Sequence, residues 1–164
     1  MEKVKVQVLI SEGVTLPKYE TSGSAGMDVR ANISEPIVLG SLERVLVPTG
    51  IKMAIPEGYE VQVRPRSGLA LKHGITLLNT PGTIDSDYRG ELKVIIANMS
   101  KDSYTINPGE RIGQLVLNKV EQIEWEVVET LDETERGAGG GRRTVPRRKE
   151  VLFLSKLRCR AYHG

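Results

Sequence analysis

Short runs in which apolar and polar residues alternate, each followed by a turn, limit the possible folds more than any other feature of this sequence. Val4, Val6, Val8 and Ile10 occupy every second position of the run 4–10, and the apolar residues of the run 59–63 do the same. A period of two is typical of strands with one buried face. Seventeen Gly and eight Pro are spread between such runs, and no helical period persists. The sequence therefore predicts an all-β chain arranged as a sandwich, jelly roll or barrel.

The expected strands are short, with one helical turn among them. They lie at 4–10, 28–33, 37–39, 45–47, 51–55, 59–63, 75–78, 92–97, around 106, at 115–117 and, as a last strand or pair, at 123–131. Ser67 can N-cap a helical turn at 68–72, which Gly74 would end. We expect residues 1–131 to form one β domain. Residues 132–164 become polar, then Gly-rich, then basic, and we expect them to form a mobile arm.

The formal net charge of +2 hides a division along the chain. Residues 142–164 hold eight Lys/Arg and one Glu, so they carry +7 and residues 1–141 carry −5. A specific nucleic-acid-binding domain should show its basic patch on the folded body, so we expect no specific nucleic-acid partner. A short basic segment gives only salt-sensitive, non-specific affinity.

Cysteine usage and hydropathy indicate the compartment. The lone cysteine, Cys159, excludes an internal disulfide and fits a reducing compartment. No stretch is long and apolar enough for a membrane span. Residues 1–10 lack the order of a signal peptide. We therefore expect a cytoplasmic protein that does not bind membranes.

The stretch 78–91 is the most informative for function. Pro81-Gly82 favours a turn, because Pro presets φ at the second position and Gly supplies positive φ at the third. Asp85, Asp87 and Tyr88 follow on the same loop, which is how a fold presents a small-molecule site. Asp85 can act as a general base on a water, or can be a turn residue that bonds its own backbone. Tyr88 can pack against a sugar ring, or can be an ordinary half-buried packing residue.

Other segments offer further polar groups, each with an ordinary structural alternative. Arg66 and Ser67, with the N–H groups near Gly68, suit a phosphate, but a surface Arg and a helix cap are the commoner use. Asp28 can ligate a metal through water, orient an arginine, or simply start a strand. Asn79 can bond a base edge, but Asn is also common before turns. The sequence shows neither a zinc-type His/Cys cluster nor a Ser–His–Asp pattern.

Four segments taken in order are far more specific than any one of them. They are AGMDVRA at 25–31, RSGLA at 66–70, NTPGTIDSDYRGE at 79–91 and GERIGQL at 109–115. Together they closely resemble the first four motifs of the trimeric dUTP diphosphatases (dUTPases), over residues 1–140. The resemblance implies a distorted jelly roll of the β-clip type, a homotrimer with sites at subunit interfaces, and Mg²⁺-dependent hydrolysis of dUTP to dUMP and pyrophosphate.

The resemblance also implies a role for each matched residue. Asp85 would orient the attacking water and meet the 3′-OH, and Tyr88 would pack under the deoxyribose, leaving no room for a 2′-OH. Asp28 would support the water shell of the metal. Uracil would be read by Asn79 with main-chain groups near Thr83, Ile84 and Lys93. The phosphates would be held, from a neighbouring subunit, by Arg66, Ser67, Gly68 and Gln114.

The resemblance fails in the family's fifth motif, a flexible arm with the pattern Arg-Gly-x-Gly-Gly-Phe-Gly-Ser-Thr-Gly. Arg136 and the residues up to 140 match it. Gly141 then stands where the family's Phe stacks on uracil, and Arg142 and Arg143 replace the next Gly and Ser. Loss of a stacking ring, about 1–3 kcal/mol on the base-stacking scale, predicts weakened catalysis with binding partly kept, unless Arg142 and Arg143 serve as phosphate ligands.

Three other functions are alternatives to dUTP hydrolysis. A dCTP deaminase of the same fold has a Glu five residues after the glycine that corresponds to Gly90, and here Ile95 occupies that position. A nucleotide-binding trimer without catalysis, or with weak catalysis, is the second. A structural, capsid-like jelly roll without a site is the third, and it requires the four ordered motifs to be coincidental.

Overall fold

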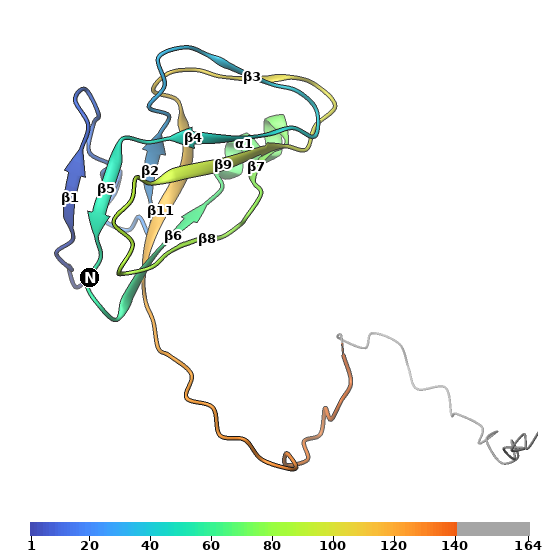
Figure 1. The fold of residues 1–164 in the computed structure, drawn as a ribbon. Helices are drawn as coiled ribbons and strands as arrows, with labels where there is room; N and C mark the ends of the chain where they lie inside the picture. Colours follow the sequence, from blue (N-terminus) through green and yellow to red (C-terminus); the bar gives the residue numbers. More distant parts are fainter. Residues whose placement is uncertain (141–164) are drawn as a thin grey trace, which may run out of the picture. The chain divides into compact units, whose positions relative to one another are not determined.

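The computed structural model describes residues 1–140, and the expected basic end from Arg142 onward, with Cys159, lies outside them. The described residues form strands and one short helix (Figure 1). The elements are β1 Gln7–Ile10, β2 Met27–Arg30, β3 Ile37–Leu39, β4 Arg44–Pro48, β5 Ile51–Ala54, β6 Tyr59–Arg64, α1 Ser67–His73, β7 Ile75–Leu77, β8 Gly82–Ile84, β9 Lys93–Asn98, β10 Tyr104–Ile106 and β11 Arg111–Lys119. The chain divides into a compact unit, Met1–Ile123, and a second unit that begins at Glu124.

Within the first unit, two antiparallel sheets enclose the core. One has the strand order β2-β11-β6-β8 and the other β4-β9-β7, with the pairs β1-β5 and β10-β3 beside them. Figure 1 shows β4 and β9 running across β11. Successive side chains of a strand point to opposite faces, and the inward ones from both sheets meet in one buried cluster that includes Val61, Val63, Leu115, Val47, Val94 and Ile96. The predicted all-β, jelly-roll-like fold is confirmed.

The expected strand 28–33 ends at Arg30 in β2, and the expected strand 115–117 is part of the longer β11. Two further expected strands differ more. The run 4–10 becomes β1 only from Gln7, where it pairs with β5, and all four residues of β1 are exposed. The run 123–131 contains no strand. Its apolar side chains stay exposed, Ile123 at 72%, Trp125 at 82% and Val127 at 96%. Alternation alone does not make a strand, since the backbone N–H and C=O groups need a neighbouring strand to pair with.

The helical turn is confirmed, but its start differs from the prediction. Helix α1 begins at Ser67 itself, Arg66 is the N-cap residue, and no side-chain hydrogen bond caps this end. The predicted end is correct: Gly74 adopts the left-handed conformation, with φ of 65°, and its N–H donates to the carbonyl of Ala70 at 3.0 Å. No helix within residues 1–140 is long and apolar enough to cross a membrane.

The turn that leads into β8 also differs from the prediction. Gly82 is the first residue of β8 and is not among the glycines with positive φ. The turn lies earlier, at residues 78–81, and the Thr80–Pro81 peptide is cis. Residues 75–84 therefore form two short strands joined by a tight turn, rather than one strand followed by a loop.

Candidate active site

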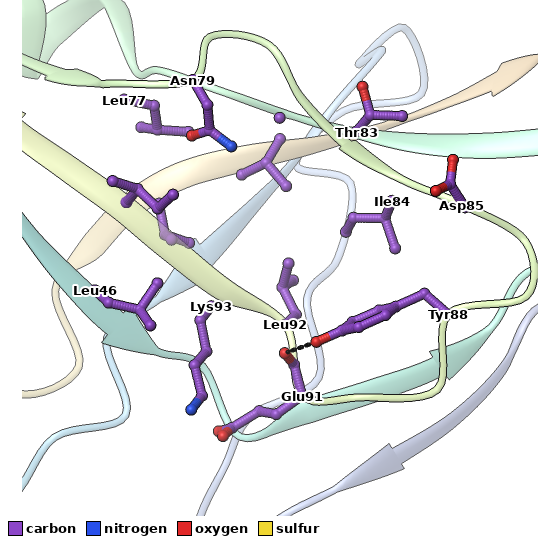
Figure 2. A pocket seen from close by; sticks show the side chains of 14 residues that line it. Leu46, Leu77, Asn79, Thr83, Ile84, Asp85, Tyr88, Glu91, Leu92 and Lys93 are labelled. Carbon is purple, nitrogen blue, oxygen red and sulfur yellow. Dashed lines mark hydrogen bonds between the residues drawn. The ribbon is translucent and has the colours of Figure 1, made fainter.

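A pocket of about 300 Å³ lies along residues 78–93, which we call the ribbon (Figure 2). It is lined by all six ribbon residues that the sequence predicted for the base, the sugar and the water, namely Asn79, Thr83, Ile84, Asp85, Tyr88 and Lys93. Its apolar lining includes Leu77, Ile84 and Leu92, whose side chains are nearly inaccessible to solvent, and Leu46, which is exposed. Such a pocket, apolar with a few polar groups at its edge, suits a small flat ligand.

The ribbon crosses between the two sheets, and this crossing creates the pocket. Strand β7 pairs with β9 through Leu77 and Ile96, whereas β8 pairs with β6 through Gly82 and Val63. Residues 78–81 must therefore pass from one layer to the other. Within residues 1–140, β8 is the last strand of its sheet. An edge strand presents a row of N–H and C=O groups that pair with no neighbouring strand.

Asp85 and Tyr88 share a turn on the ribbon. The Tyr88 N–H donates to the carbonyl of Asp85 at 3.2 Å, and the Tyr88 hydroxyl donates to the carbonyl of Glu91 at 3.1 Å (Figure 2). The Asp85 side chain is exposed at the pocket edge. Its carboxylate makes no hydrogen bond or ion pair with any other residue between 1 and 140, so no backbone bond of the turn-Asp kind occupies it.

A second set of polar residues gathers where β2, β11 and β6 lie side by side. In the sheet register Gln114 lies opposite both Asp28 and Arg64. Arg66 Nε donates to Asp28 Oδ1 at 3.2 Å, and Arg111 Nη1 donates to Asp28 Oδ2 at 3.3 Å. We call Asp28, Arg66, Arg111 and Gln114 the polar cluster. The three charged side chains are 24–46% exposed, so each ion pair contributes about 0–1 kcal/mol to stability.

Gln114 is held at both ends of its amide. Its Nε2 donates to the carbonyl of Pro65 at 3.0 Å. Its Oε1 lies so close to Gly26 that a Cβ added there would be 2.7 Å away. A side chain at position 26 would therefore displace the Gln114 amide from where it lies.

Tyr104, whose pKa is affected by the charge of Arg66, forms a half-buried hydrogen bond with Glu110. The sequence did not predict this contact. The Tyr104 hydroxyl donates to the Glu110 carboxylate, whose other oxygen accepts the Asn107 N–H at 2.9 Å. Burial, followed by the hydrogen bond and the charge of Glu110, raises the pKa of Tyr104 to about 12, against the opposing charge of Arg66. The His73 ring lies 5.0 Å from that of Tyr104, tilted by 49°.

Apart from Arg136, the predicted site residues thus fall into two groups within the chain. None of Asp28, Arg66, Ser67, Gly68 and Gln114 lines the ribbon pocket. Arg136 belongs to the second unit, where its Nε donates to the carbonyl of Gly139 at 3.0 Å. Sequence reasoning missed Arg111 as a partner of Asp28 and Glu91 as the acceptor for Tyr88, although both lie inside the matched motifs.

Comparison with known proteins gives one consistent family. The dUTPase family model matches residues 12–145. The deoxyuridine 5′-triphosphate nucleotidohydrolase of Fusobacterium nucleatum is 74% identical over 140 residues, 85% of this chain and 96% of the relative. That of Finegoldia magna is 57% identical over 137 residues, 84% of this chain and 96% of the relative.

Solved structures agree with the sequence relatives. The dUTPase of Staphylococcus bacteriophage 80alpha with dUpNHpp is similar with a TM-score of 0.75 and 28% identity, over 84% of this chain and 96% of that one. A variant dUTPase of phage phi11 of S. aureus, described as coordinating a structural Mg(II) ion, is similar with a TM-score of 0.70 and 27% identity, over 79% of this chain and all of that one.

Proposed function

Since this chain belongs to the dUTPase family and is a dUTP diphosphatase, we propose that it hydrolyses dUTP by in-line attack of a water that Asp85 orients. The water oxygen forms a bond to the α-phosphorus as the bond from that phosphorus to the bridging oxygen breaks. The products are dUMP and pyrophosphate, and no covalent enzyme intermediate is needed. Catalysis then rests on positioning and on neutralising charge.

The observation that carries this proposal is the free carboxylate of Asp85 beside the ribbon pocket. A general base must be within hydrogen-bond reach of the proton that it takes. The Asp85 carboxylate has no competing partner among residues 1–140, and Ile84 and Tyr88 flank it on the pocket wall. Its side chain is therefore available to a water and to the sugar 3′-OH.

The edge of β8 is the proposed reader of the base. One side of β8 pairs with β6, which leaves main-chain groups of Thr83 and Ile84 to pair with uracil, together with Asn79 and the backbone near Lys93. Cytosine presents the opposite donor and acceptor pattern at the 4-position. A buried group left unpaired costs about 1–3 kcal/mol. Tyr88 packs under the deoxyribose, and the apolar lining rejects the methyl group of thymine by contact.

The polar cluster is the proposed phosphate side of the site, contributed by a neighbouring subunit of a homotrimer. Arg66, Ser67, Gly68 and Gln114 lie outside the ribbon pocket of their own chain. A second copy can supply them to that pocket, with Arg66 as the charged ligand for phosphate. The separation of the two groups within one protomer supports a site that needs more than one chain.

Magnesium is the proposed cofactor, carried in on the triphosphate. Among residues 1–140 no group of three or more His, Cys, Asp and Glu side chains could hold a metal. Mg²⁺ commonly binds through substrate phosphates, water and one or two carboxylates. Arg66 and Arg111 use one acceptor position on each oxygen of Asp28, out of about four on a carboxylate. Asp28 thus fits an outer role toward metal-bound water, and the ion would neutralise charge on the phosphoryl oxygens.

The altered fifth motif is the reason to expect reduced turnover. Gly141, Arg142 and Arg143 lie outside the described residues, so this proposal rests on the sequence alone. The altered motif also favours a second candidate function, a weakly active or non-catalytic nucleotide-binding trimer. Restoring Gly141→Phe together with the missing arm residues should raise kcat/KM, and no gain would refute the idea of a defective arm.

Pyrophosphate release from dUTP with Mg²⁺ is the experiment that tests the proposal. We expect release from dUTP, much less from dCTP, UTP and dTTP, and a large loss in Asp85→Asn. Binding of dUTP without pyrophosphate release would favour the second candidate. Ammonia release from dCTP would instead indicate a deaminase.

A further inference from the structure

The ring of Tyr88 lies directly against the backbone of Gly90. A Cβ added at position 90 would be 2.4 Å from Tyr88 Oη, 2.6 Å from Cζ and 3.0 Å from Cε2. Carbon atoms separate best at about 3.5–4.0 Å, so a side chain at 90 would force the ring to move by roughly 1 Å. Gly90 is not among the glycines with positive φ. The glycine is therefore required by the ring and not by the backbone conformation.

The carbonyl that accepts the Tyr88 hydroxyl is itself held in place. Glu91 supplies this carbonyl, and its Oε1 accepts the Gly50 N–H at 2.9 Å. The next residue, Leu92, donates its N–H to the carbonyl of Ile51 at 2.8 Å and accepts the Thr49 hydroxyl at 2.6 Å. The segment under the ring is thus tied to the corner between β4 and β5. Tyr88 is 49% exposed, yet its outer end has a fixed support.

We propose that Gly90 is a positioning residue that sets the preference for deoxyribose over ribose, because it allows the hydroxyl end of the Tyr88 ring to lie against the backbone at position 90. This inference rests on the proposed function, in which Tyr88 packs under the sugar. A methyl group at 90 displaces the ring end and breaks its bond to Glu91. The ring then no longer defines the space where a 2′-OH would sit.

The first test compares Gly90→Ala with a matched control, Gly23→Ala. A Cβ at Gly23 meets nothing within 4 Å, and its φ is not in the left-handed region. The measured quantity is the ratio of kcat/KM for dUTP to that for UTP. We expect this ratio to fall on the order of 10- to 100-fold in Gly90→Ala, the scale for an ångström-sized misplacement, and to stay unchanged in Gly23→Ala. An unchanged ratio in Gly90→Ala overturns the inference.

A double-mutant cycle tests whether Gly90 acts through the ring. In a Tyr88→Ala background, Gly90→Ala should change the ratio by less than about twofold, because coupled sites lose their joint effect when one partner is removed. A full effect without the ring overturns the inference. If Gly90→Ala does not fold, as judged by its thermal transition, Tyr88→Phe replaces it. That variant keeps the ring against Gly90 but loses the hydroxyl bond to Glu91. Its preference should fall less than that of Tyr88→Ala, and an equal loss would place the support in the hydroxyl bond and not in the contact with Gly90, which overturns the inference.

A binding measurement separates this inference from the proposed function. Calorimetric titration with dUpNHpp and with its ribose counterpart gives the sugar preference without turnover. Should the wild-type chain release no pyrophosphate, the proposed function fails, and the titrations still decide whether Gly90→Ala weakens the preference. Should pyrophosphate release be normal and the titrated preference be equal in wild type and Gly90→Ala, only the inference about Gly90 fails.

Discussion

The ribbon and the polar cluster are built in opposite ways. The ribbon is continuous in sequence, and its pocket has an apolar wall with main-chain groups at its edge. The polar cluster joins three segments that are distant in sequence, and it consists of charges that already have partners, with Asp28 bonded to Arg66 and Arg111. In the proposed function, recognition of the nucleoside then depends on one continuous segment, whereas recognition of the phosphates depends on how the strands β2, β11 and β6 assemble.

The largest expected effect concerns Asp85, which lies on the ribbon but is proposed to act on the phosphate chain. Asp85→Asn should lower kcat for dUTP by about 10²- to 10⁴-fold, the range for loss of a general base. Its carboxylate has no partner within residues 1–140, so the thermal transition should not change. Steady-state kinetics with pyrophosphate detection measures this effect. Asp87→Asn, on the same exposed turn, is the control, and equal losses in both variants would contradict the role given to Asp85.

The second largest effect is expected for Asp28→Ala, which should weaken phosphate binding and leave nucleoside binding unchanged. Arg66 and Arg111 lose their shared partner, and a misplaced phosphate ligand raises KM for dUTP about 10- to 100-fold. Binding of deoxyuridine, which has no phosphate, should be unchanged in calorimetry. The exposed carboxylate Glu12 gives the control, Glu12→Ala. A matching loss of deoxyuridine affinity would show that the two regions are not independent.

A smaller effect is expected on the ribbon side. Asn79→Ala should reduce the preference for dUTP over dCTP by about tenfold, since an unpaired polar group in the pocket costs about 1–3 kcal/mol. The Mg²⁺ concentration required for half-maximal activity should stay the same. Competition assays with both nucleotides measure the preference, with Asn118→Ala on β11 as the control. A change in the magnesium dependence of Asn79→Ala would contradict the independence of the ribbon and the polar cluster.

The smallest effect involves stability at high pH. The pKa of Tyr104 is raised to about 12 in the folded chain from 10. The folded state then holds the hydroxyl proton more tightly than the unfolded state. Its contribution to the free energy of unfolding is present below pH 10 and decreases as pH rises to about 12. Urea unfolding across this range should show a steeper decline in wild type than in Tyr104→Phe, and parallel curves would contradict it.

The sequence predicted the strands well where the run has at least one neighbouring strand to pair with. The run 59–63 became β6, which lies between β11 and β8. The run 123–131 has the same alternation but no partner strand within residues 1–140, so it forms no strand. Ser67 was expected to cap α1, but the chain enters the helix one residue earlier, at Arg66. Local pattern decides whether a segment can be a strand or helix, and the available neighbours decide whether it becomes one.

The candidate site could be predicted only in part, for a related reason. Asn79, Asp85 and Tyr88 are close in sequence and were placed together by the turn between two short strands. The pairing of Asp28 with Arg66 and Arg111 spans 38 and 83 positions. It depends on which strands are adjacent, which no local pattern encodes. The contact between Tyr88 and Gly90 could not be predicted either. A glycine in a sequence does not show which side chain occupies the space that its own Cβ would fill.

The open edge of β8 has a consequence for how the molecule tolerates change. Peptide groups are the same whatever side chain they carry, so a nucleobase held along this edge would be read by chemistry that point mutations at Thr83 or Ile84 leave intact. Substitutions at these positions would alter the shape of the pocket and the affinity. The discrimination between the keto group of uracil and the amino group of cytosine would persist.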